Sequence, residues 1–316
     1  MKRLGAAVIG CGSWGRNHAR VYSDIKNVKL EAVADTLEKN ARDIGEKHRV
    51  SWSTEPDTVI QSPNIDLVSI CTPTVTHYEL ALRAIESGKH VLVEKPMTNT
   101  LEEAKELIKA AQRNNVKLTV GFVERFNTAV EEALNLIRAG EIGDVILAHT
   151  RRLSRRPLRI GDVGVIKDLA IHDIDITNQL FPGMPDSVYA IAGNIAHQFE
   201  DYANISIRHP KNRTAFIETN WLTPRKTRTL TVTGSEGIIN VEYITQELTI
   251  ENYQSVRQPL LNPQEPLQRE LESFVQAILD DKTPAVTGED GLKALAICEA
   301  ALTSVKLGQP VEPKIN

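Results

Sequence analysis

Short apolar runs alternate with amphipathic segments over the first 122 residues, and this alternation restricts the fold more than any other feature of the sequence. The apolar runs cover residues 4–9, 30–34, 67–70, 90–93 and 117–121. Most of them are continuously apolar, which is typical of parallel strands buried on both faces. Helix-like segments lie between the runs, at about 14–24, 37–48, 76–87 and 101–114. This repetition with short connections predicts an α/β fold with a doubly wound parallel sheet.

The pattern changes after residue 122. A helix is predicted over residues 125–139, and Gly140 supplies its stop signal. Strands are predicted at 186–196, 202–208, 214–221, 228–234, 238–241 and 247–251, and two helices at about 265–281 and 289–307. Because turn-forming residues rather than long crossovers separate these strands, we expect them to pair antiparallel. The chain is therefore predicted to hold an α/β domain at 1–122 and an α+β domain at 123–316.

Charge and cysteine content exclude several classes of protein. The 316 residues carry 37 Lys and Arg against 41 Asp and Glu, so no global basic field is available for nucleic acid or an anionic membrane. Cys11, Cys71 and Cys298 lie far apart, which argues against a disulfide framework or a structural zinc site. No apolar run approaches the roughly 18 residues that span a bilayer. We predict a cytoplasmic protein that binds neither nucleic acid nor membrane.

A glycine loop points to a dinucleotide. Residues 10–15 read Gly-Cys-Gly-Ser-Trp-Gly, a G-x-G-x-x-G sequence that follows a predicted strand and opens a predicted helix. In such loops Gly10 makes the turn, Gly12 lets the backbone approach a pyrophosphate, and Gly15 lets helix and strand pack closely. The helix N-terminus, which begins with Ser13 and Trp14, offers amide donors and the positive end of a dipole to the phosphates.

Asp35 supports the same prediction. It ends the second predicted strand, twenty residues after Gly15, where a carboxylate can accept hydrogen bonds from ribose hydroxyls. A carboxylate also repels the 2′-phosphate of NADP, and no Arg follows immediately, so NAD is the expected cofactor. The alternative is a structural glycine turn next to a solvated carboxylate.

Three more motifs carry a resemblance to a known family. Residues 71–77 (Cys-Thr-Pro-Thr-Val-Thr-His) and 94–96 (Glu-Lys-Pro) follow predicted strands, and residues 168–175 fit the pattern D-x-x-x-H-x-x-D. With the glycine loop, they resemble the Gfo/Idh/MocA family of sugar and inositol dehydrogenases along essentially the whole chain. The resemblance implies an N-terminal Rossmann domain that binds NAD and a C-terminal domain with a large open-faced antiparallel sheet and helices. It assigns a second group of cofactor-lining positions to Thr72, Pro73, His77, Glu94 and Lys95.

The resemblance also assigns the catalytic roles to Lys95, Asp168 and His172. Oxidation of a secondary alcohol needs a base for the hydroxyl proton, and His172 suits that task. If residues 168–175 are helical, the i, i+4 spacing places Asp168 on the same face, where it can orient the imidazole. Lys95 would place a cation beside the developing alkoxide.

Structural readings compete with these catalytic roles. Lys95 can be a solvated lysine at a strand end, and His172 a satisfied core histidine with Asp168 as its structural partner. We expect Asp175 to be a structural carboxylate rather than a catalytic one. No metal is expected, because hydride transfer needs none and no further histidine lies nearby in the sequence.

The substrate is suggested by arginines. Residues 151–159 hold five Arg in nine residues, including Arg155 and Arg156, and guanidinium groups bind phosphates bidentately. A nucleotide-sugar is therefore a candidate substrate, whereas a basic edge strand or a subunit contact would explain the cluster without one. RNA is poorly supported, because no aromatic residues are interleaved to stack bases.

Two segments extend the resemblance to particular members. Residues 124–127 (Glu-Arg-Phe-Asn) look like the E-R-F-N-P sequence of members that oxidise UDP-N-acetylhexosamines, although Thr128 replaces the proline, and residues 159–166 resemble the approach to Asp168 in such members. This match implies NAD-dependent oxidation of the sugar at C3 to a ketone, with Arg125 and Asn127 as substrate-binding residues beside His172.

Other functions stay open. The enzyme could oxidise inositol or a free aldose, and the chain could instead be a catalytically silent NAD-binding regulatory protein. The retention of Lys95 and His172 argues against the silent protein. An open antiparallel sheet needs covering, so we also expect a homodimer or homotetramer built through it.

Overall fold

The first sheet of the computed structural model, which describes residues 3–155 and 162–315, has six parallel strands in the order β3-β2-β1-β4-β5-β6. This is the doubly wound order of dinucleotide-binding domains. All six residues of β1 are buried, as expected for a central strand covered on both faces. The strands are β1 (Leu4–Ile9), β2 (Val28–Ala34), β3 (Ser51–Ser53), β4 (Leu67–Ile70), β5 (His90–Glu94) and β6 (Leu118–Gly121).

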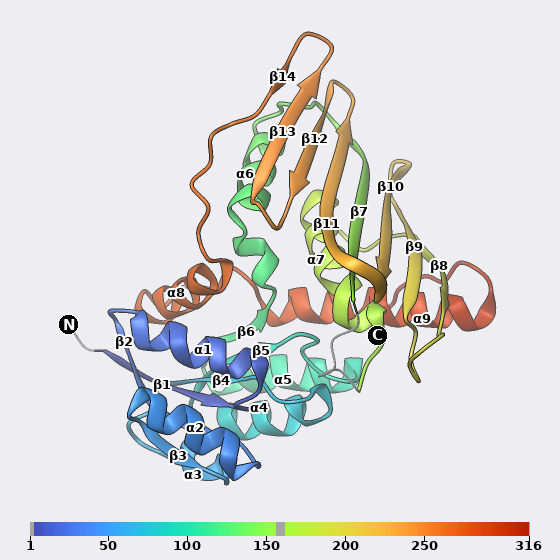
Figure 1. Ribbon diagram of the computed structural model, residues 1–316. Helices are drawn as coiled ribbons and strands as arrows, with labels where there is room; N and C mark the ends of the chain where they lie inside the picture. The colour runs from blue at the N-terminus through green and yellow to red at the C-terminus, as the bar shows by residue number, and fades with distance from the viewer. Residues whose placement is uncertain (1–2, 156–161, 316) are drawn as a thin grey trace. The chain divides into compact units, whose positions relative to one another are not determined.

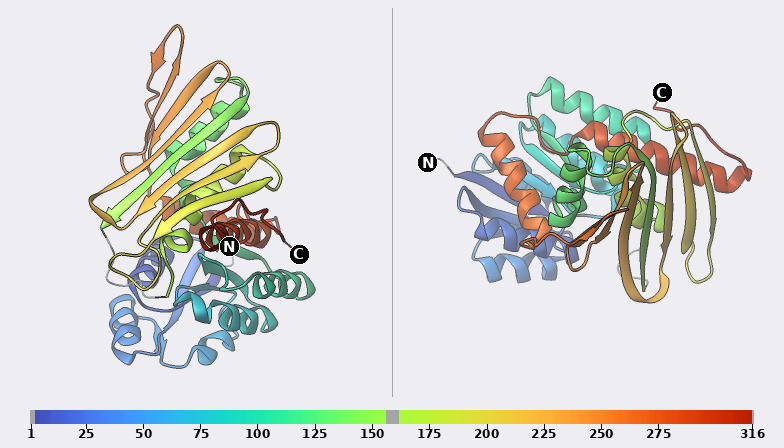
Figure 2. Two further views of the ribbon diagram at one scale, coloured as in Figure 1. Left: turned by 90° about the vertical axis from the view of Figure 1, so that its right-hand side faces the viewer. Right: turned by 90° about the horizontal axis from the view of Figure 1, so that it is seen from above.

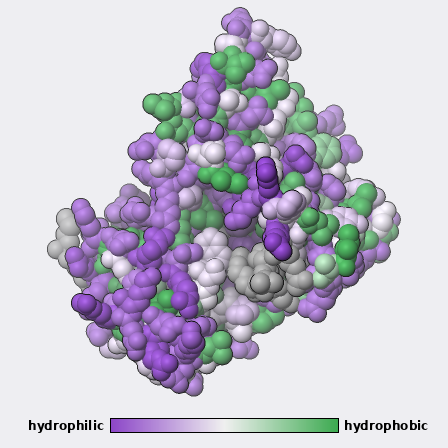
Figure 3. Space-filling model, viewed as in Figure 1, coloured by the Kyte–Doolittle hydropathy of each residue, from purple (hydrophilic) through white to green (hydrophobic). Residues whose placement is uncertain are grey.

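The helices between these strands present one apolar face to the sheet and one polar face to solvent. In Figure 3 the surface over α2 and α3 is mainly hydrophilic. A capping box formed by Thr100 and Glu103 begins α5. The helices are α1 (Ser13–Asp24), α2 (Glu38–His48), α3 (Pro56–Ile60), α4 (His77–Glu86), preceded by the 3₁₀ turn η1 (Thr74–Thr76), and α5 (Leu101–Arg113). The predicted elements are confirmed here, and β3 and α3 were not predicted.

The described chain divides into two compact units, and the first takes in a segment from near the C-terminus. The first unit is Met1–Phe122 with Leu267–Leu292, and the second is Val123–Pro266 with Lys293–Asn316. A boundary at residue 122 alone would place 267–292 in the second domain. In the structure this segment adjoins β6, where the Thr119 hydroxyl donates to the Val286 carbonyl at 2.7 Å. It carries α8 (Pro266–Leu279) and the beginning of α9 (Gly288–Leu307).

The second unit is built on an eight-stranded sheet of order β14-β13-β12-β11-β7-β10-β9-β8. The expectation of purely antiparallel pairing is wrong at one place. β7, which was not predicted, lies between β10 and β11, and it pairs parallel with β10. The strands are β7 (Val145–Arg155), β8 (Ser187–Gly193), β9 (Tyr202–His209), β10 (Arg213–Asn220), β11 (Leu222–Gly234), β12 (Gly237–Glu242), β13 (Glu247–Asn252) and β14 (Val256–Arg257).

The two faces of this sheet differ. On β10 the buried residues Ala215, Ile217 and Thr219 alternate with the exposed Phe216, because successive side chains point to opposite faces. Figure 2 (left) shows the strands with one broad face turned to the viewer and helices of this unit behind it. We call the face that carries Phe216 the outer face and the opposite one the inner face.

Helices α6 (Thr128–Arg138) and α7 (Ile171–Leu180) belong to the second unit and are labelled in Figure 1. The helix predicted over 125–139 is two pieces, the 3₁₀ turn η2 (Val123–Phe126) and then α6. Asn127 separates them, with extended backbone and its side chain capping the new helix. Within residues 3–155 and 162–315, no helix has both the length and the apolar composition that a membrane span requires.

Candidate active site

The glycine loop has the geometry that its sequence predicts. Gly10 has φ +92°, and a Cβ atom there would lie 2.7 Å from the Cys71 carbonyl, so the turn at the end of β1 requires glycine. A Cβ atom on Gly15 would lie 1.7 Å from the Gly10 carbonyl oxygen. Only glycine therefore lets α1 begin this close to the strand.

The start of α1 suits the phosphates of a dinucleotide. Gly12 is the N-cap residue and makes no side-chain cap, so the first amides of α1 are not covered by a capping side chain. A Cβ atom on Gly12 would meet no atom within 4 Å, which leaves room for a ligand beside the loop, and Ser13 is exposed. Burial, together with the Asp35 carboxylate, raises the pKa of the Cys11 thiol to about 12. The loop therefore presents no thiolate to an anionic cofactor at neutral pH.

The Asp35 carboxylate accepts hydrogen bonds from the backbone and still has acceptor positions for ribose hydroxyls. Its Oδ2 accepts the Cys11 amide at 2.7 Å, and its Oδ1 accepts the Leu37 amide at 2.8 Å. A carboxylate has about four acceptor positions, so these two bonds leave capacity for ribose hydroxyls. The sequence predicted the ribose contact and missed the bond that fixes the loop to the end of β2.

His77 ties together the segments that follow β4 and β5. Its Nε2 lies 2.9 Å from the Thr72 carbonyl oxygen, and its Nδ1 lies 2.9 Å from the Pro96 carbonyl oxygen. The ring is 1% exposed. These contacts hold Thr72 and Pro73 beside the Lys95–Pro96 segment, so His77 positions the loops of the predicted cofactor site through its ring.

Glu94 is buried in a similar supporting position. Its Oε1 lies 3.1 Å from His18 Nε2 on α1, and its Oε2 accepts the Lys95 amide at 3.3 Å. A Cβ atom on Gly121 of β6 would lie 3.0 Å from the carboxylate, so Gly121 leaves room for it. Trp14 packs edge-on against His18, with ring centroids 6.4 Å apart. The glutamate thus links α1 to the start of the segment that carries Lys95.

Asp168 and His172 lie on a helical segment that changes type. Residues Ile166–Ala170 form a π-helical turn, η3, and α7 follows directly. Residues 168–170 are therefore π-helical, with i→i+5 hydrogen bonds, and the α-helical i, i+4 relation between Asp168 and His172 does not apply at the start of this segment. Both side chains are buried, Asp168 at 5% and His172 at 8% exposure. The Glu200 carboxylate accepts the Ile166 amide at 3.1 Å and so holds the beginning of the turn.

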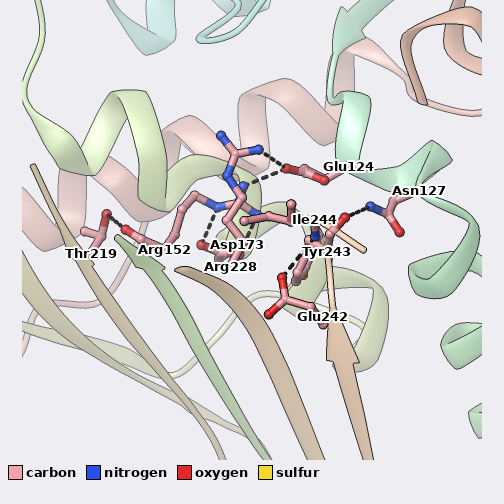
Figure 4. Close-up of polar contacts among 9 residues, drawn as sticks. All are labelled: Glu124, Asn127, Arg152, Asp173, Thr219, Arg228, Glu242, Tyr243 and Ile244. Atoms are coloured by element: carbon pink, nitrogen blue, oxygen red, sulfur yellow. Dashed lines mark hydrogen bonds and ion pairs between the residues drawn. The ribbon is translucent and has the colours of Figure 1, made fainter. Parts of the chain in front are cut away.

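A buried ion-pair network surrounds α7 (Figure 4). The Arg152 guanidinium of β7 binds Asp173 of α7 through two hydrogen bonds of 2.9 and 3.0 Å, and it binds Glu124 of η2 at 2.6 Å. Burial lowers the pKa of Arg152, but the two carboxylates outweigh it, and the pKa lies well above its usual value. Arg228 of β11 donates to the same Glu124 oxygen at 3.1 Å. Asp173, the residue next to His172, is thus bound to β7 through Arg152.

The predicted substrate-binding residues Arg125 and Asn127 make structural contacts. Arg125 pairs bidentately with Asp175 at 2.7 and 2.5 Å, so Asp175 has a structural partner. Asn127 is 2% exposed, and its amide nitrogen donates to the Tyr243 carbonyl at 2.9 Å. Its amide oxygen accepts the Ala129 amide at 3.1 Å, which caps α6. Arg125 therefore binds α7, and Asn127 binds α6 and the residue that follows β12.

Of the arginine-rich segment, the described residues 151–155 place their arginines on different faces of the sheet. Because strand residues alternate between faces, Arg151 lies on the outer face with Glu218, whereas Arg152 lies on the inner face. The strand is central in the sheet, so the suggestion of a basic edge strand is wrong. Arg155 is exposed at the end of β7, and Arg156 lies outside the described residues.

Sequence reasoning missed the residues that act through distant partners. His18 and Arg228 contact Glu94 and Glu124, which lie 76 and 104 positions away. His18 follows the glycine loop by one helical turn, which is a usable local signal for a residue near the site. Arg228 has no such signal, because only the pairing of β7 with β11 brings it beside Arg152.

Comparison with known proteins identifies the family. Residues 4–122 match the family of oxidoreductases with an NAD-binding Rossmann fold, GFO_IDH_MocA, and residues 130–240 match the GFO/IDH/MocA C-terminal domain. The first unit is therefore an NAD-binding Rossmann domain, and its glycine loop, α1 N-terminus and Asp35 are the residues that fit the cofactor.

Relatives of two substrate classes align along nearly the whole chain. The scyllo-inositol 2-dehydrogenase (NAD(+)) of Bacillus subtilis is 30% identical over 97% of this chain and 95% of its own length. The UDP-N-acetylglucosamine 3-dehydrogenase of Acidithiobacillus ferrooxidans is 28% identical over 94% of this chain and 95% of its own length. A solved structure of the latter matches with a TM-score of 0.90, covering 97% of this chain and 99% of that one. With both units matched and the glycine loop in place, this chain belongs to the Gfo/Idh/MocA family of NAD-binding oxidoreductases.

Proposed function

We propose that the protein is a dehydrogenase that oxidises the C3 hydroxyl of a UDP-N-acetylhexosamine to a ketone. The observation that carries this proposal is the full-length likeness to UDP-N-acetylglucosamine 3-dehydrogenase, in sequence and in fold. The Glu-Arg-Phe-Asn segment at 124–127 supports it by its resemblance to members that oxidise UDP-N-acetylhexosamines, and its Glu124 and Arg125 pair with Arg152 and Asp175. This segment therefore belongs to the framework of the helix that bears His172.

The reaction divides into tasks for named groups. NAD, when bound, accepts a hydride from the alcohol carbon. His172 would accept the hydroxyl proton, with Asp168 supporting the charged imidazole, and Lys95 would stabilise the developing negative charge on oxygen. The network through Arg152 and Asp173 keeps the backbone next to His172 in place.

An inositol dehydrogenase is the second candidate, because a relative with that activity is 30% identical over 97% of the chain.

The deciding experiment incubates purified protein and NAD with UDP-N-acetylglucosamine, N-acetylglucosamine, myo-inositol or scyllo-inositol. NADH formation is followed optically, and the product is identified by mass spectrometry. We expect NADH and a 3-keto product with the UDP-sugar, and competitive inhibition by UDP. Turnover of an inositol without inhibition by UDP would replace this function with the second candidate. No turnover despite NAD binding would favour a catalytically silent NAD-binding protein.

The catalytic assignment makes a direct prediction. Lys95→Ala and His172→Ala should each lower kcat by about 100-fold or more, because each removes a group that acts in the transition state. The affinity for NAD, measured by titration calorimetry, should change little in His172→Ala. Lys109→Ala, at an exposed lysine of α5, is a matched control and should retain activity. Near-normal turnover in either catalytic variant would remove that residue from the mechanism.

We also propose that copies of the chain assemble through the outer face of the eight-stranded sheet. Tyr189, Ile191 and Phe216 lie on this face and are 37%, 56% and 43% exposed. Exposed apolar side chains that gather on one face are typical of protein interfaces. Phe216→Glu should therefore shift the light-scattering mass toward the monomer. Leu279→Glu is the control: Leu279 ends α8 in the first unit, is 41% exposed, and its substitution should leave the mass unchanged. A monomeric wild-type protein would refute this assembly.

The cytoplasm is the location we propose. Cys11, Cys71 and Cys298 are all free thiols, which agrees with a reducing compartment. A fusion to a reporter that fluoresces only in that compartment would test the location.

A further inference from the structure

Two arginines stand side by side on the inner face of the sheet. Arg228 of β11 is the register partner of Arg152 of β7, and neighbouring strands lie about 4.8 Å apart. Both guanidinium groups donate to the same oxygen of Glu124 (Figure 4). Arg152 also donates two hydrogen bonds to Asp173, the residue next to His172. The inner face at Arg152 and Arg228 therefore faces the helix that carries the proposed base.

The two arginines are engaged to different degrees. Arg152 is 2% exposed and uses three of its nitrogens in hydrogen bonds to carboxylates. The Arg228 side chain is 33% exposed, and among residues 3–155 and 162–315 its guanidinium makes one hydrogen bond, to Glu124. A guanidinium has five N–H donors, so Arg228 retains most of its donor capacity. Arg152 is a structural residue, whereas Arg228 has donors to offer a ligand.

The charges around Arg228 favour a neutral acceptor over a full anion. Arg152 is matched by Asp173, and Arg228 is matched by Glu124, so the four side chains carry no net charge. Asp168 is also close enough to raise the pKa of Arg228, although burial and Arg152 lower it overall. A phosphate placed here would meet Glu124 and Asp168 as well as Arg228. A carbonyl oxygen would accept the guanidinium donors without that repulsion.

We propose that Arg228 donates to the carbonyl oxygen of the substrate's 2-acetamido group and so selects N-acetylhexosamines over hexoses. The inference rests on the proposed function, since C2 adjoins the carbon at which the reaction takes place. If His172 is the base, a substituent next to the reacting carbon must lie beside Asp168 and His172. Arg228 is partly exposed and lies next to Arg152, which binds the helix that carries His172. Arg228 is thus a specificity-determining residue for the acyl group, distinct from whichever residues hold the diphosphate.

The test compares two UDP-sugars in the presence of saturating NAD. Arg228→Met keeps an unbranched apolar stem and removes the donors, and Arg228→Lys keeps a charge without the planar fork. Arg225→Met is the matched control, because Arg225 is an exposed arginine on the same strand. For each variant, kcat/KM is measured with UDP-N-acetylglucosamine and UDP-glucose, with the inhibition constant of UDP and the NAD affinity alongside. Unchanged NAD affinity and thermal midpoint establish that a variant is folded.

The expected result is a loss of selectivity. In Arg228→Met, kcat/KM for UDP-N-acetylglucosamine should fall about 10- to 100-fold, the effect of one lost hydrogen bond to a charged donor. The value for UDP-glucose and the inhibition constant of UDP should stay within about twofold. Arg228→Lys should fall between these limits, and Arg225→Met should behave as wild type.

Four other outcomes overturn the inference. An equal loss with both sugars would make Arg228 a support for Glu124 and Asp168 rather than an acyl contact. A weaker affinity for UDP would place the diphosphate at Arg228. If wild-type protein oxidises inositols and neither UDP-sugar, the proposed function fails and this inference fails with it. Unchanged selectivity in an Arg228→Met enzyme that does oxidise UDP-N-acetylglucosamine refutes the inference alone.

Discussion

At the scale of single residues, the predicted cofactor positions in the first unit have a second task. Asp35 bonds the glycine loop, His77 joins two loops, and Glu94 joins α1 to the Lys95 segment. Asp35 and Glu94 accept main-chain amides near strand ends, whereas the His77 ring lies within hydrogen-bond distance of two main-chain carbonyl oxygens. Substitution of these residues should therefore affect the shape of the cofactor site as well as direct contacts to NAD.

The His18–Glu94 pair gives a stability prediction. Both groups are buried, and His18→Ala would leave the Glu94 carboxylate with one partner fewer. We expect the free energy of unfolding in urea to fall by about 1–3 kcal/mol. Glu94→Gln and the double variant complete a cycle, and the coupling energy should exceed about 0.5 kcal/mol. Additive effects would show that the two side chains do not depend on each other.

Local motifs and distant partners were not equally predictable. The glycine loop and Asp35 lie within one βαβ unit, so fixed spacing and known loop geometry predict their places. The partners of Arg125 and Arg152 lie 50 and 21 positions away and depend on how α7 packs on the sheet. A single sequence contains no spacing rule for such pairs. Nothing in the sequence therefore indicated that the Arg125 guanidinium pairs with Asp175, and its contact with substrate stays a prediction.

At the scale of elements, the π turn that carries Asp168 depends on a close approach. A Cβ atom on Gly164 would lie 2.1 Å from the Glu200 carboxyl carbon, and that carboxylate accepts the Ile166 amide. Gly164→Ala should displace Glu200, remove this bond and loosen the start of the turn. We expect a loss of about 1–3 kcal/mol in stability by thermal or urea unfolding.

Relief of the clash is the control for this prediction. Glu200→Ala gives up the same bond without a collision, so Gly164→Ala combined with Glu200→Ala should be no less stable than Glu200→Ala alone. If Gly164→Ala lowers the stability of the Glu200→Ala variant as much as it lowers that of wild type, the cost lies in the backbone at residue 164 and not in the collision with Glu200.

The failure to predict β3, β7 and the parallel pair has physical reasons. β3 has three residues, Ser51–Ser53, and too few apolar positions to be distinguished from a loop. β7 was overlooked because its arginines suggested a ligand patch, yet one of them is fully buried by carboxylates from α7 and η2. Insertion of β7 between β10 and β11 then produces the parallel pair, which no pattern within 186–250 could indicate. Strand existence was predictable in this region, whereas strand order was not.

At the scale of the whole molecule, Asp201 and His209 of the second unit make folding depend on pH in two different ranges. Asp201 is buried, which raises its pKa, but amides of Ala196, Ile195 and His197 outweigh this and lower it below 3.8 overall. A carboxyl group with a lowered folded pKa contributes stability above its unfolded pKa, and that contribution is lost as the pH falls through the folded value. Asp201 therefore matters only in strong acid.

His209 acts at milder pH. It is 1% exposed and stacked 4.6 Å from the Phe181 ring, and burial, aided by Lys293 and Arg213, lowers its pKa from 6.5 to about 4. The unfolded chain binds this proton at a higher pH than the folded chain does. Stability should therefore be complete above about pH 6.5 and decline toward pH 4, by up to about 3 kcal/mol from this group. His209→Phe should flatten that decline in urea unfolding. If the free energy of unfolding of His209→Phe falls between pH 6.5 and pH 4 as much as that of wild type, groups other than His209 bind the protons that destabilise the fold.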